Sequence, residues 1–177
     1  MFYKVSLLLC FLQLGSAYGV WHDVGNACVG ARDNSFAGIT YNGPSSFVDA
    51  VKLVHTSGYV SNRMSTKRVS LWGDPKFNKS LNILITDDLN RILYPSPRLT
   101  TISNYGWYTL PKYTGLSPNL VFSDSGAPQY FEKGDKLRIW YGEDWRGGRT
   151  ELDNHGKSCM HVKFHLTGCK HGMPALG

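Results

Sequence analysis

The segment from residue 143 to residue 154 concentrates side chains whose oxygen atoms could hold a cation. These side chains are Glu143, Asp144, Glu151, Asp153 and Asn154. Because Ca²⁺ takes about six to eight oxygen ligands, the segment is a candidate calcium site. The spacing matches no EF-hand loop, and the carboxylates could instead pair with Arg146 and Arg149 in a solvated loop. The sequence leaves both interpretations open.

Two tryptophans flank the start of this acidic segment and suggest a site for sugars. Residues 136–141 alternate in character as a strand does, which places Trp140 on the face opposite Leu137 and Ile139. An exposed aromatic ring beside carboxylates can stack on a sugar ring while the carboxylates accept hydrogen bonds from its hydroxyls. We therefore expect a ligand-binding site made of Trp140, Trp145, Glu143 and Asp144. The competing interpretation is that these rings pack in the core.

The sequence patterns that could indicate zinc binding or catalysis are weaker than those for calcium or sugar binding. His161 and His165 share a strand face but would lie about 13 Å apart, too far for one ion with bonds near about 2 Å. Neither G-x-S-x-G nor H-E-x-x-H occurs. A carboxylate pair such as Glu143 and Glu151 could serve a glycosidase, but any acidic loop contains such pairs. The sequence thus favours a protein without catalytic activity.

The start of the chain has the three parts of a secretory signal peptide. Lys4 supplies the positive charge, residues 5–14 are mostly apolar, and Gly15, Ser16 and Ala17 are small residues suited to cleavage. An apolar run of about ten residues is shorter than the about 20 needed to cross a bilayer. We therefore predict a signal peptide at 1–17 and one secreted, extracellular domain at 18–177, without membrane insertion.

The number and distribution of charges limit the classes of partner that this predicted domain could bind. The formal net charge is +6, and loss of Lys4 with the signal would lower it to +5. The basic residues are dispersed, with no run of five like charges, which argues against nucleic acid as a partner. A modest positive field suits solubility and also acidic glycans or anionic surfaces. The sequon Asn78-Lys79-Ser80 predicts glycosylation of Asn78 in a secreted chain.

The cysteines predict one internal bridge. Cys10 lies in the signal, which leaves Cys28, Cys159 and Cys169, an odd number. A bridge between Cys159 and Cys169 would require the predicted strand between them to fold back, because about ten extended residues span about 33 Å whereas bridged Cα atoms lie about 5.5 Å apart. We expect Cys28–Cys159, with Cys28–Cys169 as the second choice. Cys169 would then stay a free thiol or link two chains into a dimer.

Strand patterns dominate the remainder of the chain. Alternation marks residues 136–141 and 161–166, and two apolar runs on either side of the turn-rich segment 86–90 predict a hairpin. Further candidate strands are 47–55, 106–110 and 120–122. No sustained helical period is present, and 19 Gly and 8 Pro punctuate the sequence. The predicted fold is all-β, a single jelly-roll-like β-sandwich.

Four blocks of sequence carry a resemblance that extends over about residues 20–166. They are CVGARD (28–33), VKLVHTSG (51–58), LRIWYGED (137–144) and DNHGKSC (153–159). The set resembles an uncharacterised secreted module of cnidarian and other marine-invertebrate extracellular proteins. The resemblance implies the Cys28–Cys159 bridge. Where that family tends to carry two further cysteines, this chain has Asn62 and Asp74, so a second internal bridge is absent.

The sequence predicts a secreted extracellular module that binds a glycan or a cell-surface or matrix protein without catalysis. Two alternatives come from different classes. One is an extracellular enzyme that acts on polysaccharide. The other is a small secreted effector such as a toxin, suggested by the size, the basic charge and the export signal.

Overall fold

The computed structural model describes residues 19–63, 69–147 and 151–167, and about half of these residues lie in strands. The strands are β1 (Val20–Gly30), β2 (Ala37–Thr40), β3 (Ser46–Ser61), β4 (Ile83–Asp87), β5 (Ile92–Tyr94), β6 (Asn119–Ser123), β7 (Gln129–Phe131), β8 (Lys136–Tyr141) and β9 (His155–Thr167), and the helix α1 spans Gly142–Arg146. None of the described helices is long and apolar enough to cross a membrane.

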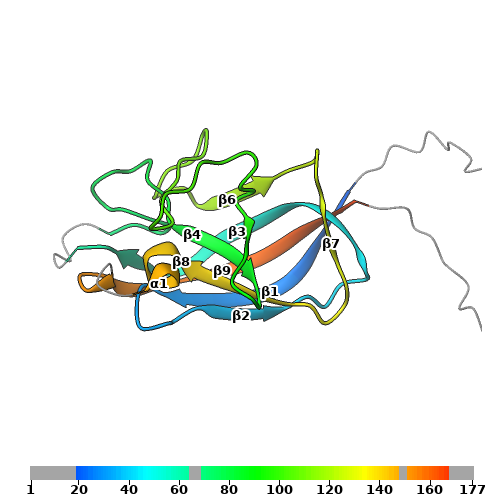
Figure 1. Cartoon of the computed structure of the whole chain (residues 1–177), viewed down its shortest axis with the longest axis horizontal. Coiled ribbons are helices and arrows are strands. Elements are labelled where there is room, and N and C mark those ends of the chain that lie inside the picture. The colour runs from blue at the N-terminus through cyan, green and yellow to red at the C-terminus, as the bar shows by residue number, and fades with distance from the viewer. Residues whose placement is uncertain (1–18, 64–68, 148–150, 168–177) are drawn as a thin grey trace, which may run out of the picture.

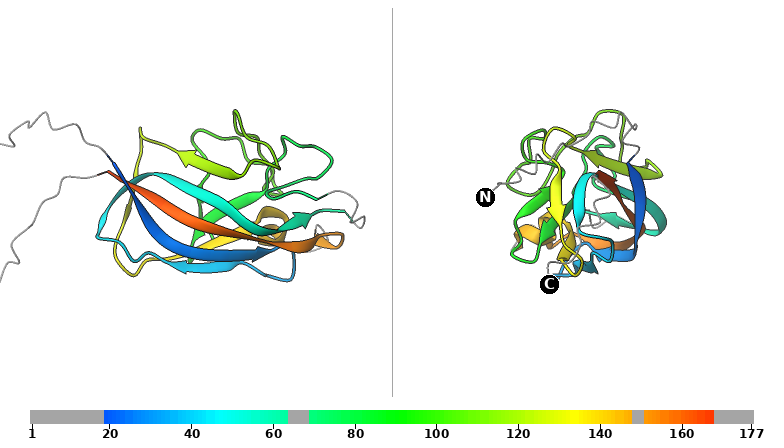
Figure 2. Two further views of the ribbon diagram at one scale, coloured as in Figure 1. Left: turned by 180° about the vertical axis from the view of Figure 1, so that it is seen from behind. Right: turned by 90° about the vertical axis from the view of Figure 1, so that its right-hand side faces the viewer.

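The strands form two antiparallel sheets that pack face to face. The five-stranded sheet has the order β1-β9-β3-β6, with β7 also paired to β3, and the four-stranded sheet has the order β2-β8-β4-β5. Figure 1 shows the two layers from the side, and the end-on view of Figure 2 shows the sheets enclosing the space between them. The predicted all-β sandwich is confirmed.

Strand β9 organises the larger sheet, because it pairs with β1 on one side and with β3 on the other. Its pairing with β1 begins at Val20 opposite Leu166 and continues to Gly30 opposite Lys157. Its pairing with β3 ends where Ser61 lies opposite His155. The first and last described residues therefore lie together at one end of the sandwich, as Figure 2 shows, and residues 61 and 155 lie at the other.

The same register explains the disulfide. Cys28 lies directly opposite Cys159, with a Cα–Cα distance of 4.0 Å, and the two are bonded. The predicted Cys28–Cys159 bridge is confirmed. Cys169 and the predicted signal peptide lie outside the described residues, so the free thiol, the disulfide-linked dimer and the cleavage site stay predictions.

The core lies between the sheets and consists of inward side chains from both. From the larger sheet, Leu53, Val162 and Phe164 are fully buried, and they meet Ile85 and Ile139 from the smaller one. Fully burying one such side chain contributes roughly 1.5–3 kcal/mol. The inward positions alternate along β9, as predicted for residues 161–166.

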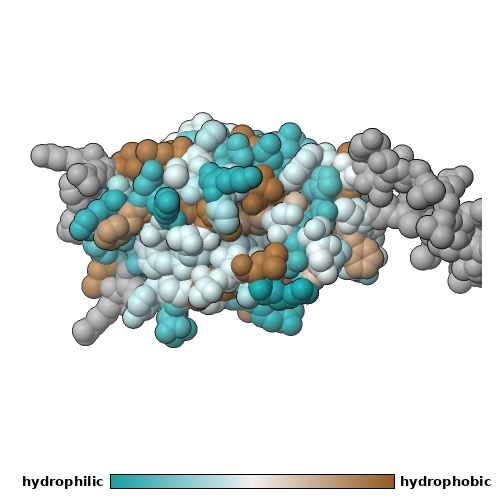
Figure 3. Space-filling view, turned by 90° about the horizontal axis from the view of Figure 1, so that it is seen from above, coloured by the Kyte–Doolittle hydropathy of each residue, from teal (hydrophilic) through white to brown (hydrophobic). Residues whose placement is uncertain are grey.

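Long connections before β4 and before β6 cover one side of the sandwich. They bury Trp72, whose indole donates to the carbonyl of Ser117 (2.6 Å), and Tyr108, whose hydroxyl donates to the carbonyl of Ile83 (2.6 Å). On the face in Figure 3, hydrophobic residues form several small groups separated by polar ones. The surface on this side therefore presents no single large apolar patch.

The strand predictions were correct in part. Residues 47–55 belong to the longer β3, residues 120–122 lie in β6, and β4 and β5 form the predicted hairpin. Residues 106–110 were wrongly predicted as a strand, because only Tyr108 forms a bridge there, with Leu81. Strands β1, β2 and β7 and the short helix α1 were not predicted from the sequence.

Candidate ligand-binding site

Trp140 is a core residue, and the expectation that it points into solvent is wrong. It is only 4% exposed, and the ring of Phe36 packs against it with 4.7 Å between centroids. The reason is the position of β8 between β2 and β4, with the turn before β2 laid over the outer face. Both faces of β8 are therefore buried near its end, and Trp140 cannot serve as an exposed stacking platform.

Trp145 lies on α1 and is half-buried. Its indole nitrogen donates to the carbonyl of Asn90 in the β4–β5 turn (3.2 Å), and its ring packs partly against the core. This contact directs the ring toward the hairpin. A role for Trp145 in ligand binding stays a prediction.

Three residues of the acidic segment hold the turn that precedes β2. The two carboxylate oxygens of Asp144 accept the backbone N–H groups of Asn34 (2.7 Å) and Ser35 (2.8 Å). Glu151 accepts the N–H of Asp33 (2.9 Å), and the amide of Asn154 donates to the carbonyl of Ala31 (3.0 Å). Asp144, Glu151 and Asn154 thus fix the cover over Trp140.

Burial and the neighbouring Glu151 together raise the pKa of Asp144 to about 6, against the lowering effect of the two N–H donors. The charge of Glu151 therefore favours the protonated form of Asp144.

The five predicted calcium ligands have different partners. Asp144 and Glu151 accept N–H groups of the turn before β2, and Glu143 accepts the Trp107 indole. Asn154 contacts both Ala31 and Glu143, and Asp153 is exposed. Among the residues that the structure describes, no group of three or more His, Cys, Asp or Glu side chains is arranged to hold a metal ion. Calcium binding stays a prediction, and the alternative pairing with Arg149 falls outside the described residues.

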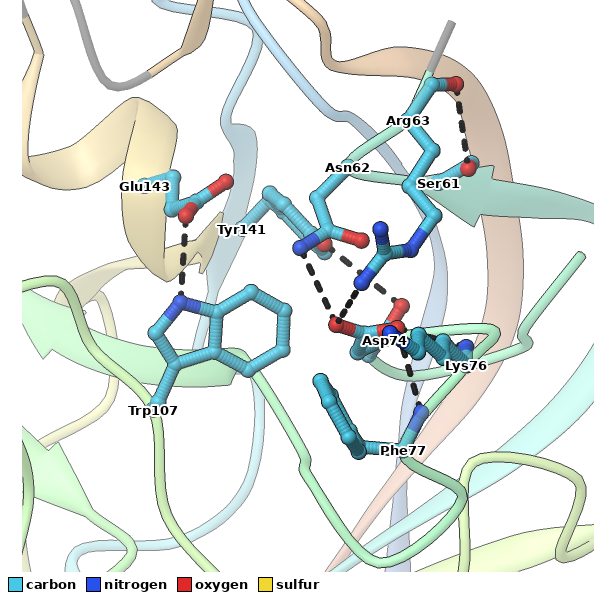
Figure 4. Close-up of polar contacts among 10 residues, drawn as sticks. Ser61, Asn62, Arg63, Asp74, Lys76, Phe77, Trp107, Tyr141 and Glu143 are labelled. Carbon is cyan, nitrogen blue, oxygen red and sulfur yellow. Dashed lines mark hydrogen bonds and ion pairs between the residues drawn. The ribbon is translucent and has the colours of Figure 1, made fainter. Parts of the chain in front are cut away.

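A different group of side chains comes together at the far end of β3 and forms what we call the polar cluster. Its members are Asn62, Arg63, Asp74, Trp107, Tyr141 and Glu143, shown in Figure 4. They come from the end of β3, the two long connections, the end of β8 and the start of α1. Of these, the sequence analysis had singled out only Glu143 as a site residue.

Two close backbone approaches bring these segments together. A Cβ on Gly73 would lie 2.0 Å from the carbonyl oxygen of Ser80, so only glycine fits at this position. Gly106 has a φ of +78°, and a Cβ there would lie 2.6 Å from the Cα of Gly142. Gly106 thus places Trp107 next to the start of α1, and Gly73 lets the chain just before Asp74 lie against Ser80.

Asp74 is the anionic centre of the polar cluster. Its side chain accepts hydrogen bonds from Asn62 (3.3 Å), Arg63 (3.2 Å) and the backbone N–H groups of Lys76 (2.5 Å) and Phe77 (3.2 Å). Burial raises the pKa of this carboxyl, but the hydrogen bonds outweigh burial and the net pKa is lowered. Asp74 is thus a buried carboxylate with a full set of donors.

The side chains of Asn62 and Asp74 lie in contact, because the Asn62 amide donates to the Asp74 carboxylate (3.3 Å). This hydrogen bond joins the end of β3 to the connection that follows it. The resemblance to the secreted module had implied cysteines of that family at these two positions, and that implication stays a prediction.

On the opposite side of the polar cluster, the carboxylate of Glu143 holds the indole ring of Trp107. The indole nitrogen of Trp107 donates to Glu143 (3.1 Å), and the ring meets Tyr141 edge to face with 6.1 Å between centroids. Burial raises the pKa of Glu143, and the charges of Asp153 and Asp74 add to the effect against hydrogen bonds from Trp107 and Asn154. Both Trp107 and Glu143 are half-buried, so part of each stays accessible.

Several buried polar atoms around the polar cluster have no hydrogen-bond partner among the described residues. They are Asn62 Oδ1, Arg63 Nε, Asn154 Oδ1 and His155 Nε2. Pairing of Ser61 with His155 across the sheet brings these four residues to the same end of β3 and β9. Because an unsatisfied buried polar group costs about 1–3 kcal/mol, such a concentration marks a place suited to polar ligand atoms or water.

Exposed groups border the polar cluster on the solvent side. The ring of Phe77 is 56% exposed, with the ammonium of Lys76 at 5.0 Å and the guanidinium of Arg63 at 5.9 Å from its centroid. The next residue, Asn78, is exposed in the same turn, and its glycosylation stays a prediction.

The comparisons with known proteins point to one solved structure. The fold matches AJLec, a lectin from the sea anemone Anthopleura japonica, with a TM-score of 0.76 and 29% identity over 84% of this chain and 98% of AJLec. No family model matches the sequence, and no curated protein matches it either. The similarity to a cnidarian protein agrees with the origin of the resembling module.

Proposed function

We propose that this protein is an extracellular carbohydrate-binding protein and that the polar cluster is its saccharide site. The observation that carries the proposal is the placement of an accessible indole ring, Trp107, beside Glu143, Asn62 and Arg63. The lectin activity implied by the name AJLec, on a fold shared over 84% of this chain, supports the proposal. The internal disulfide is in keeping with an oxidising compartment.

The chemistry of the polar cluster suits a sugar. A pyranose has an apolar face that can stack on the accessible part of the Trp107 ring. Its hydroxyls both donate and accept hydrogen bonds, and the half-buried Glu143 supplies an acceptor while Arg63, whose side chain is 37% exposed, supplies donors. Asp74 holds Asn62 and Arg63 in place before a ligand arrives, which reduces the ordering cost of binding.

A polysaccharide-cleaving enzyme is the second candidate, favoured by one observation. Glu143 and Asp74 lie in one cluster with pKa values shifted in opposite directions, as the acid and base of a glycosidase require. Against this, both oxygens of Asp74 are engaged by four donors, which assigns that carboxylate a supporting role. Release of fragments from an oligosaccharide over time would favour the enzyme, and stable binding without release favours the lectin.

The test compares two tryptophans on a glycan array and in titrations with the glycan that binds best. Trp107→Ala should weaken affinity at least about tenfold, because it removes the stacking surface. Trp145→Ala is the matched control, since it removes a half-buried indole outside the polar cluster. Melting temperatures of both variants separate loss of binding from loss of fold.

The opposite result, in which Trp145→Ala abolishes binding and Trp107→Ala does not, would contradict the polar cluster and support the site predicted from sequence. Absence of any glycan bound by the folded protein would contradict the proposed function itself.

A further inference from the structure

A pocket lies at the edge of the sandwich, between β7 of the larger sheet and the β4–β5 hairpin of the smaller one. Its volume is about 330 Å³, and its buried or half-buried lining residues Leu93, Phe131 and Leu137 form an apolar floor. Ligand pockets typically measure about 300–1,000 Å³, so this one lies at the small end of that range. It shares no residue with the polar cluster.

The rim of this pocket is polar and held in place. Asp87 accepts the N–H groups of Leu89 and Arg91 (both 2.9 Å) and pairs with the Arg91 guanidinium (2.5 Å), which fixes the hairpin turn. On the other side, Asp135 accepts the N–H of Glu132 (2.9 Å) and so fixes the turn before β8. Rim groups held in this way lose little freedom when a ligand binds.

An aromatic ring stands at the mouth of the pocket. Tyr130 is 52% exposed and is supported by Phe47, whose ring meets it edge to face with 5.1 Å between centroids. The ring offers a flat surface with a hydroxyl at its tip, which suits a ligand that is apolar on one face and polar at its edges.

The charges of the rim favour an uncharged ligand. Asp87, Asp88 and Asp135 face Arg91 and Lys136, which leaves a formal charge of −1 from three carboxylates and two cations. A sulfated or phosphorylated group would meet more negative than positive charge there. A neutral saccharide, with hydroxyls that match both donors and acceptors, fits the apolar floor, the ring and the mixed rim together.

We propose that this pocket, the β7 pocket, is a second saccharide-binding site, so that one chain can join two glycans. The inference rests on the proposed function, because it assigns the same ligand class to both sites. Strand β8 connects them: Lys136 and Leu137 line the β7 pocket, and Tyr141 belongs to the polar cluster. At about 3.4 Å per residue, the two ends of β8 lie about 15 Å or more apart, which leaves room for two separate sugar units.

The test uses the ¹⁵N-labelled full secreted chain and a panel of methyl glycosides of galactose, glucose, mannose, fucose and N-acetylglucosamine. Nuclear magnetic resonance follows two sets of signals: the Trp107 indole for the polar cluster, and the amides of Arg91 and Phe131 for the β7 pocket. We expect one glycoside to shift the β7-pocket amides saturably. Tyr130→Ala should weaken that response at least about tenfold and leave the Trp107 response unchanged.

Tyr105→Ala is the matched control, because Tyr105 is 49% exposed and does not line the β7 pocket. A response of the Trp107 indole with silent β7-pocket amides would overturn the second site and leave the proposed function intact. Silence of both sets across the panel would overturn both. Equal loss of the β7-pocket response in Tyr105→Ala and Tyr130→Ala would also overturn the assignment.

Discussion

At the scale of single residues, Asp74 shows how one buried carboxylate can organise a site. Its four hydrogen bonds reach two side chains from the end of β3 and two backbone groups of its own turn. Removing a partner from a buried polar network leaves the remaining groups desolvated and unpaired, which costs more than the net value of the bonds.

Asp74→Ala should therefore lower the free energy of unfolding by about 2–4 kcal/mol at neutral pH, measured by urea denaturation. The net pKa of Asp74 is lowered from 3.8, so its contribution is present above that value and lost as the pH falls through the lower folded pKa. The difference between the variant and the wild type should shrink below about pH 4. Asp88→Ala, at an exposed position, is the control, and an equal effect of both substitutions would contradict the network.

The sequence could not predict the burial of individual side chains on a strand, because burial depends on which other segments cover each face of the sheet. The alternation in residues 136–141 correctly placed Leu137 and Ile139 in the core, but it could not show that a turn covers the other face and buries Trp140. Asn62, Arg63 and Asp74 meet only because β3 continues past Gly58 to Ser61 and the chain then returns. The resemblance to the secreted module was the one reason to consider Asn62 and Asp74 together before the structure.

At the scale of elements, the turn before β2 covers one face of β8, and two carboxyl groups hold this turn in place. Asp144 and Glu151 accept hydrogen bonds from the consecutive backbone N–H groups of residues 33–35. When both are ionised they repel each other, and when they share a proton they do not. The strength of this attachment must therefore depend on pH.

The direction of this pH dependence follows from the pKa of Asp144, which burial and the neighbouring Glu151 raise from 3.8 to about 6. The folded state binds the proton more tightly than the unfolded state, so the contribution is fully present below 3.8 and is lost as the pH rises through about 6. Glu151→Gln should remove the repulsion, raise the melting temperature at pH 7.5, and flatten the change in stability between pH 7.5 and pH 5. A variant that is less stable than the wild type at pH 7.5 would show that Glu151 contributes more through Asp33 than it costs through Asp144.

Elements with strong alternation were predictable, and elements stabilised by their neighbours were not. The pattern in β9 was clear over residues 161–166, because inward and outward residues there differ in polarity at each step. β1 contains Gly25 and Asn26, which disfavour strands, and it is held by its long pairing with β9. Pairing of this kind is a tertiary effect that no short window of sequence contains.

At the scale of the whole molecule, the disulfide joins the first and last described strands across 131 residues of sequence. In the chain-entropy account, a bridge that closes so long a loop destabilises the unfolded chain more than a short one does. The sequence argued against a bridge within the last strand, because that strand would have had to fold back, and it left Cys28–Cys169 as the second choice behind the pairing observed.

Replacing Cys28 and Cys159 together with serine should lower the free energy of unfolding by about 2–5 kcal/mol and leave the affinity for glycan unchanged. The bridge lies along the β1–β9 pair, and neither cysteine belongs to the polar cluster. Denaturation curves and glycan titrations of the double variant test both parts. Loss of affinity in a variant that stays folded would show that the saccharide site depends on this bridge.

The pairing of β9 along its full length also sets how the domain can be displayed. Val20 opposite Leu166 puts both described ends at one pole of the sandwich, while Ser61 opposite His155 puts the polar cluster at the other. Phe47, which supports Tyr130 of the β7 pocket, lies opposite Thr167 at the first pole. If the domain were attached to a surface before Gly19 or after Thr167, the polar cluster would point away from that surface and the β7 pocket would lie near it. Glycans should then reach the polar cluster easily, and the surface should hinder their access to the β7 pocket.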